Sequence, residues 1–296
     1  MRHLLEIDDL SLDELKDVLA RSADPDLRPG LAGRGVALVF EKPSARTRNS
    51  CEMAVFQLGA HGVYIQGSEV GFDVRETTED IARTLAGYYA VVCARVFKHA
   101  TLERMAATDS VPIVNLLSDQ AHPMQALADI LTLQQEFGED LAGRTIAYVG
   151  DPNNVWRSLS IAAGMLGANL RLAAPAGHHP SEANLARIEA AGGKPIISNS
   201  PAEAVDGADA VYTDVWVSMG EEGDAGAKKA AFAHFTVTNE VMEAAGPGAI
   251  FMHCLPAHRG EEVAAEVADG PQSRIWPQAE NRMHSARGLL SWLSEQ

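Results

Sequence analysis

The sequence predicts an α/β protein with two doubly wound domains, each containing a parallel sheet, joined by long helices. Short continuous apolar runs, typical of strands buried on both faces, alternate with stretches of helical periodicity. This alternation reaches a long helical stretch near 123–137 and then begins again. We therefore expect a first domain over 1–132, with a C-terminal helix of about 281–296 packing back on it, and a second domain over 133–280.

The first predicted domain begins with a helix whose start carries a capping box, formed by Ser11 and Glu14. The helix that follows the first strand stops at Gly59, and the long one starts at Pro123, where a missing N–H costs nothing. Apolar runs predict strands at 35–40, 62–65, 90–97 and 111–117, and helical periodicity predicts helices at 46–58, 78–87 and 123–137.

The second predicted domain repeats the same alternation of strand and helix. Its strands are expected within 144–151, 168–175, 208–216 and 248–256, and its helices at 155–167 and 181–193. The last helical segment, within 279–296, is the one expected to pack back on the first domain. The turn after its first strand reads Gly-Asp-Pro-Asn-Asn-Val, at the place where a dinucleotide-binding domain carries G-x-G-x-x-G. Pro152 and two asparagine side chains would obstruct a pyrophosphate, which argues against a nicotinamide-dependent dehydrogenase.

Charge and residue usage exclude several classes of protein. Lys and Arg number 24 against 40 Asp and Glu, a net charge of −16, so nucleic acid is not an expected partner. No apolar stretch reaches about 18 residues, and the acidic start lacks the apolar core of a secretory signal. We expect no membrane association and a cytoplasmic location. The cysteines at 51, 93 and 254 are too scattered for a disulfide framework or a zinc site, and no metal is expected.

The stretch EKPSARTR (41–48) follows a predicted strand and opens a predicted helix. A helix N-terminus offers unpaired N–H groups and the positive end of a dipole. Ser44 and Thr47 add hydroxyl groups, and Arg46 and Arg48 add guanidinium groups suited to phosphate oxygens. A solvated basic turn is the alternative. The position at the carboxyl end of a parallel strand favours an anion site.

Three further stretches place reactive side chains at the ends of predicted elements. In AHPMQ, His122 is either a structural cap or a donor to a carbonyl oxygen, with Gln125 three residues on. Asp214, at the end of a strand, either holds an ammonium group or is a helix cap or part of a solvated loop. Cys254, also at a strand end, is either an inert buried thiol or part of a site edge. Taken alone, the His122 signal favours a structural cap, and the other two signals leave both readings open.

Taken together and in this order, the motifs SARTR, HPMQ, DVWVSMG and HCLPAHRGEEV resemble the aspartate/ornithine carbamoyltransferase family, and specifically its ornithine branch. The resemblance runs from residue 2 to the C-terminus. Aspartate members carry H-P-L-P where this chain has H-C-L-P. The resemblance implies carbamoyl transfer from carbamoyl phosphate to the side-chain amine of L-ornithine, giving citrulline and phosphate in arginine metabolism. It implies no cofactor, and a homotrimer with active sites at subunit interfaces.

The resemblance also carries roles to individual residues. Carbamoyl phosphate would be bound by Ser44, Ala45, Arg46, Thr47, Arg95, His122, Gln125, Cys254, Leu255 and Arg282. Ornithine would be bound by Asn154, Asp214, Ser218 and Met219. The catalytic set would be Arg95, His122, Asp214 and Cys254, and the Leu255–Pro256 bond is expected to be cis.

Two positions depart from the family pattern. Ala45 stands where threonine is usual, and Glu69 lies in a loop (66–80) where a glutamine often approaches the phosphate of a neighbouring subunit. A carboxylate there would repel phosphate, so Arg75 is the alternative contact. Two other functions stay open: a carbamoyltransferase for putrescine, N-acylated ornithine or aspartate, and a catalytically idle regulatory relative.

Overall fold

The structure is a computed structural model that describes residues 1–217, 223 and 225–296. The chain divides into two compact units. Unit 1 comprises Met1–Leu131 and Glu280–Gln296, and unit 2 comprises Thr132–Ala279. Each unit has its own sheet, and the strand pairings among the described residues are parallel. The predicted fold class, two α/β domains with parallel sheets, is confirmed.

Unit 1 is built on a four-stranded sheet with the order β2-β1-β3-β4. Its strands are β1 (Gly35–Phe40), β2 (His61–Gln66), β3 (Val91–Arg95) and β4 (Ile113–Leu117). The central strands β1 and β3 are buried almost throughout, whereas the edge strand β2 is partly exposed. This is the burial that continuous apolar runs predict for strands covered on both faces.

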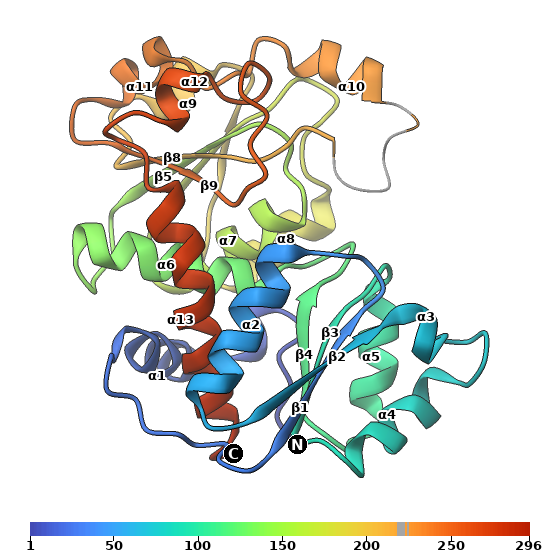
Figure 1. The fold of residues 1–296 in the computed structure, drawn as a ribbon. Coiled ribbons are helices and arrows are strands. Elements are labelled where there is room, and N and C mark those ends of the chain that lie inside the picture. The colour runs from blue at the N-terminus through green and yellow to red at the C-terminus, as the bar shows by residue number, and fades with distance from the viewer. Residues whose placement is uncertain (218–222, 224) are drawn as a thin grey trace. The chain divides into compact units, whose positions relative to one another are not determined.

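Helices cover both faces of this sheet (Figure 1). The helices of unit 1 before residue 123 are η1 (Ile7–Asp9), α1 (Leu12–Ala23), α2 (Ala45–Gln57), α3 (Gly67–Val70), α4 (Thr78–Ala86) and α5 (His99–Ala107). In Figure 1, α4 and α5 lie on one side of the sheet, with α1 and α2 on the other. From α4 and α5, the side chains of Ile81, Leu85, Leu102 and Met105 pack onto the sheet and bury the face that these two helices cover.

Unit 2 contains a five-stranded sheet with the order β7-β6-β5-β8-β9. Its strands are β5 (Thr145–Val149), β6 (Asn169–Ala173), β7 (Ile196–Ser198), β8 (Ala210–Thr213) and β9 (Ile250–His253). Its helices are α7 (Asn154–Met165), α8 (Glu182–Ala190), α9 (Pro201–Val205), α10 (Ala225–Phe232), α11 (Asn239–Ala245) and α12 (Ala265–Ala268). The short strand β7, and helices η1, α3, α5 and α9 to α12, were not expected from the sequence; α3 lies in a stretch that was predicted as a loop.

Two long helices continue from one unit into the other. They are α6 (Pro123–Phe137), which starts at the predicted proline, and α13 (Ile275–Leu293), which starts before its predicted first residue. The C-terminal part of α13 belongs to unit 1 by its contacts. It buries Ala286, Leu289 and Leu290 completely or nearly so.

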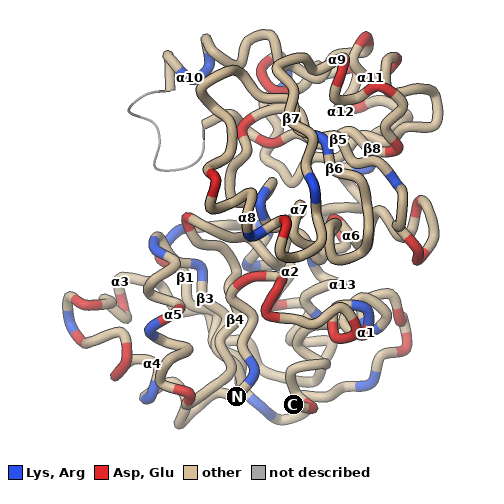
Figure 2. The backbone as a smooth tube through the Cα atoms, turned by 180° about the vertical axis from the view of Figure 1, so that it is seen from behind, with Lys and Arg blue, Asp and Glu red and all other residues tan. Residues whose placement is uncertain are grey.

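Charged residues are interspersed along the backbone of each unit (Figure 2). Within the residues that the structure describes, lysines and arginines do not gather in one segment, in agreement with the acidic balance of the sequence. Among those same residues, no helix combines the length and the apolar character that crossing a membrane would require.

Candidate functional site

In unit 1, polar side chains gather beyond the carboxyl ends of the strands. β1, β3 and β4 run parallel, so the segments that follow Phe40, Arg95 and Leu117 all leave from one edge of the sheet. The first of these segments leads to the start of α2, and the last leads to the start of α6. Open parallel sheets bind ligands at this edge.

The start of α2 has the geometry predicted for an anion site. Ser44 is the N-cap, and its hydroxyl accepts a hydrogen bond from the Thr47 N–H at 3.4 Å and donates to the Thr47 hydroxyl at 3.1 Å. Thr47 is buried, and its hydroxyl also accepts from the Arg282 guanidinium at 3.2 Å. Residues from the start of α2 and from α13 are thus brought together at one point of unit 1.

The two arginines of the SARTR motif have different surroundings. The Arg48 guanidinium lies 3.8 Å from the centre of the Tyr64 ring, and its Nε donates to Glu52 at 2.8 Å. Arg46, by contrast, makes no hydrogen bond or ion pair within the described part of the chain. Of the two, Arg46 is therefore the one available for an anion at the helix start.

Four polar side chains at this edge of the sheet are buried, each with no more than 5% of its surface exposed. They are those of Arg95, His122, Gln125 and Arg282. The Arg282 guanidinium donates to the Gln125 carbonyl oxygen, and the Gln125 amide donates to Asp129 at 2.7 Å. The predicted residues His122 and Gln125 thus lie together at this edge of the sheet. Gln125 is held by a protein partner at each end of its amide.

The imidazole of His122 is neutral in this setting. Burial lowers its pKa well below the ordinary value, and the positive charges of Arg282, Arg95 and Arg46 lower that pKa further. A neutral imidazole still has one N–H to donate. A cation here would add to the charge of three arginines, so the site favours a histidine that acts as a neutral donor.

The lowered pKa of His122 predicts a pH effect on stability. Below pH 6.5 the unfolded chain protonates this histidine and the folded chain does not, so acid favours unfolding. Relative to wild type, His122→Asn should gain stability by about 1.4 kcal/mol per pH unit as pH falls from 6.5 towards the folded pKa. Urea unfolding at several pH values measures this. The exposed His61→Asn serves as control, and parallel curves for wild type and His122→Asn would refute the assignment.

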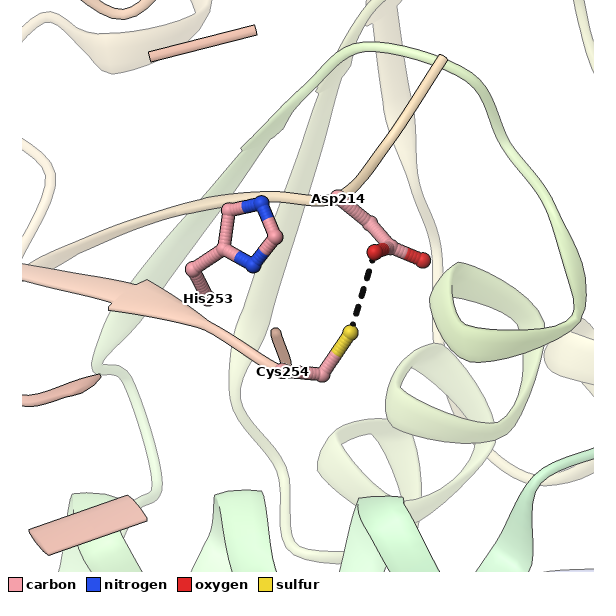
Figure 3. A group of neighbouring side chains, drawn as sticks. All are labelled: Asp214, His253 and Cys254. Atoms are coloured by element: carbon pink, nitrogen blue, oxygen red, sulfur yellow. Dashed lines mark hydrogen bonds between the residues drawn. The ribbon is translucent and has the colours of Figure 1, made fainter. Parts of the chain in front are cut away.

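In unit 2, a second group of polar side chains centres on Asp214, which follows β8. Cys254, directly after β9, donates its thiol proton to Asp214 Oδ1 at 3.0 Å (Figure 3). The Asn153 amide donates to Asp214 Oδ2 at 2.8 Å, and the Val215 N–H donates to Oδ1 at 2.8 Å. Because β8 and β9 are parallel neighbours, their carboxyl ends bring the predicted Asp214 and Cys254 together.

His253, Asp214 and Cys254 present donor atoms close enough together to hold a metal ion (Figure 3). Both ring nitrogens of His253 already have partners, however. Nδ1 accepts from the Leu255 N–H at 2.8 Å, and Nε2 faces the Glu262 carboxylate at 3.3 Å. Binding a metal through His253 would break one of these contacts. The arrangement of the three side chains therefore favours a hydrogen-bonded group over a metal centre.

The Leu255–Pro256 peptide bond is cis, as predicted from the resemblance. Leu255 has a φ of 62°, so the chain turns sharply directly after Cys254. The hydrogen bond from the Leu255 N–H to the buried His253 ring fixes this turn. The Leu255 carbonyl belongs to the same segment as the Cys254 thiol.

The predicted amine-binding residues are only partly placed. Asn154 is the first residue of α7, and its neighbour Asn153, which is not among the predicted site residues, donates its amide to Asp214. Asn153 is the N-cap of α7, and its side-chain oxygen accepts from the N–H groups of Val155 and Trp156. The sequence signal for Asn153 was its place close to the start of a predicted helix, where asparagine is a common N-cap. Ser218 and Met219 lie outside the described residues.

The loop at 66–80 keeps its two candidate residues on the surface. The Glu69 carboxylate accepts from the Gln66 N–H at 3.0 Å, and Arg75 donates to the Glu69 backbone carbonyl at 3.1 Å. The Arg104 guanidinium holds the loop through Asp73 and Glu79. The approach of Glu69 or Arg75 to the active site of a neighbouring subunit stays a prediction.

Comparison with known proteins identifies the family. Residues 2–135 match the family model described as "Aspartate/ornithine carbamoyltransferase, carbamoyl-P binding domain", and residues 142–293 match its "Asp/Orn binding domain". The "Ornithine carbamoyltransferase" of Acidothermus cellulolyticus is 46% identical, covering 99% of this chain and 96% of that one. That of Halorhodospira halophila is 43% identical and covers 99% of both chains.

Solved structures agree with the sequence comparison. The ornithine carbamoyltransferase from Thermus thermophilus matches with a TM-score of 0.90 and 40% identity, covering 99% of each chain. The enzyme from Pyrococcus furiosus matches with a TM-score of 0.92 and 39% identity, covering 98% of this chain and 96% of that one. On these matches, this chain belongs to the aspartate/ornithine carbamoyltransferase family.

Proposed function

We propose that this chain transfers the carbamoyl group of carbamoyl phosphate to the side-chain amine of L-ornithine, giving citrulline and phosphate. The observation that carries the proposal is the group around Asp214, where a carboxylate accepts hydrogen bonds from Cys254 and Asn153 at the end of β8. A carboxylate in this position suits a substrate ammonium group. Relatives of 42–46% identity named as ornithine carbamoyltransferases support the choice of amine.

In this proposal, unit 1 binds carbamoyl phosphate. The phosphate lies at the start of α2, against Ser44, Arg46, Thr47 and the backbone N–H groups of the first turn. Ala45, which replaces the usual threonine, contributes its backbone N–H. Arg95 and neutral His122 donate to the carbamoyl oxygen, where negative charge develops in the transition state. Each fixed donor of this kind contributes about 3 kcal/mol.

Gln125 and Arg282 complete the carbamoyl-phosphate site in this proposal. The Gln125 carbonyl oxygen, which now accepts from Arg282, would accept from the carbamoyl NH₂ group. Arg282 would then interact with the substrate while it keeps its contact with Thr47. The bonds from Gln125 to Asp129 and from Arg282 to Thr47 hold both side chains in place before the substrate binds, which reduces the entropy lost on binding.

Unit 2 binds ornithine in this proposal, with Asp214 accepting from its α-ammonium and Asn154, Ser218 and Met219 as the remaining contacts. Cys254 and the Leu255 carbonyl act on the reacting groups. The neutral side-chain amine attacks the carbamoyl carbon, the bond from that carbon to the phosphate oxygen breaks, and phosphate leaves. The nitrogen then loses a proton, for which the departing phosphate is an acceptor. The arginines that bind phosphate stabilise the leaving charge.

The test is a product assay with carbamoyl phosphate and, in separate reactions, ornithine, putrescine, N-acetylornithine and aspartate. We expect ureido product with ornithine alone. Product with another amine would keep the assignment of unit 1 and overturn the role given to Asp214. Absence of product with all four amines, from a protein that still binds carbamoyl phosphate, would identify an idle or regulatory relative.

We also propose that the chain forms a homotrimer with active sites at subunit interfaces. Large apolar side chains exposed on unit 1 support an assembly that covers them: Phe56 and Tyr88 are each 71% exposed, and Val74 is 88% exposed. Light scattering should give about three times the chain mass of 31.6 kDa. A monomeric mass for an active enzyme would contradict the proposal. The free thiols of all three cysteines fit the proposed cytoplasmic location.

A further inference from the structure

Two adjacent lysines on α10 form ion pairs with different exposure. Lys228 Nζ lies 2.9 Å from Asp151 Oδ2, and the two side chains are only 16% and 14% exposed. Lys229 Nζ lies 2.6 Å from Glu261 Oε1, with side chains 46% and 36% exposed. Water and salt screen an exposed pair, so its contribution is small, whereas a shielded pair fixes the position of its partners more firmly.

The shielded pair acts on the turn between β5 and α7. The Asp151 carbonyl accepts from the Asn153 N–H at 2.8 Å, inside that turn. Asn153 in turn caps α7 through its side-chain oxygen and donates its amide to Asp214 Oδ2 at 2.8 Å. A continuous series of contacts therefore runs from Lys228 through Asp151 and Asn153 to Asp214.

Removal of the Lys228 charge would leave the Asp151 carboxylate largely buried and without this ion pair. Loss of a cation from a largely buried carboxylate is costly, and the turn would shift to expose that carboxylate or to bring it another cation. A substrate ammonium is such a cation. Either response would disturb Asn153, and through it the orientation of Asp214.

We propose that Lys228 is a positioning residue for the amine substrate. It acts through Asp151 and Asn153 to fix the carboxylate of Asp214, without contacting the substrate itself. This inference rests on the proposed function, because it assigns Asp214 to the amine. It adds two residues, Lys228 and Asp151, that neither the motifs nor the family resemblance selected.

The experiment compares Lys228→Met with Lys229→Met, a matched control on the same helix. The Lys228 variant should raise KM for ornithine about tenfold, corresponding to about 1.4 kcal/mol of lost binding. The KM for carbamoyl phosphate should stay within about twofold, and Lys228→Arg should restore most of the ornithine KM. Lys229→Met should leave both constants unchanged. A purely structural role for Lys228 would alter both KM values together or neither, and would overturn the proposal.

The isosteric variant Asp151→Asn provides an independent test if Lys228→Met does not fold. It should reproduce the rise in ornithine KM, and the double variant should lose less than the sum of the two single losses. Additive losses would contradict a coupling between the two residues. The wild type is assayed first with ornithine: without citrulline there, it is the proposed function that fails. A wild type that is active beside an unaffected Lys228 variant refutes this inference alone.

Discussion

Replacing Asp214 with asparagine is expected to lower kcat/KM for ornithine about a thousandfold, equivalent to about 4 kcal/mol of lost transition-state binding. The carboxylate now accepts from the Cys254 thiol, the Asn153 amide and the Val215 N–H. Asparagine has only one accepting oxygen, and its NH₂ group would face a donor. The variant thus loses both the charge for a substrate ammonium and the contacts that orient Cys254 and Asn153.

A matched control for Asp214 lies at the other end of the same strand. Asp209 precedes β8, where it pairs with Arg144 at 2.7 Å and accepts from the Thr145 N–H at 2.8 Å. Asp209→Asn should lower stability without changing the ornithine constants by more than about twofold. Steady-state kinetics with each substrate varied, together with calorimetric binding of carbamoyl phosphate, measure both variants. An equal loss of carbamoyl-phosphate binding in Asp214→Asn would show that its effect is not confined to the amine.

The sequence predicted the strands that are buried on both faces because burial on both sides leaves a continuous apolar run. β1 (Gly35–Phe40) coincides with its predicted range for this reason. β7 (Ile196–Ser198) was missed because it has three residues at the sheet edge, with Ile196 67% exposed, and therefore carries almost no pattern. Short, exposed elements depend on their neighbours rather than on local periodicity.

The candidate site shows the same limit at single residues. The sequence contains two adjacent asparagines at 153 and 154, and only the start of α7 determines that Asn153 is the cap whose amide contacts Asp214. Likewise, Glu262 contacts His253 across nine positions of irregular chain, a separation without periodic signal. Motifs identified the segments that carry chemistry, but the direction of each side chain came from the three-dimensional structure.

The neutral state of His122 is also a property of the folded unit rather than of its motif. The HPMQ sequence places the histidine before a helix, but the low pKa comes from burial and from three arginines at positions 46, 95 and 282. Arg282 comes from α13, far along the chain. The family resemblance could suggest Arg282 as a ligand, whereas its effect on His122 follows only from their proximity.

The second large effect is expected at the start of α2, where Arg46→Ala should weaken binding of carbamoyl phosphate about 100- to 1000-fold. Residues two apart on a helix do not share a face, so Arg46 and Arg48 cannot both serve one ligand equally. In the structure Arg48 lies over Tyr64 and pairs with Glu52, while Arg46 is left for the anion.

Arg48→Ala is therefore the matched control, with the same change of charge and side chain two positions away. It should reduce carbamoyl-phosphate binding by less than about fivefold, because it removes only long-range attraction that salt screens. Calorimetric titration of both variants with carbamoyl phosphate and with inorganic phosphate, at low and high salt, separates the two contributions. The Arg46 loss should persist at high salt, because a direct guanidinium–phosphate contact is short-range, and the Arg48 loss should disappear. Equal losses in both variants would mean that the start of α2 attracts anions by its overall charge, and that the phosphate site assigned to Arg46 is wrong.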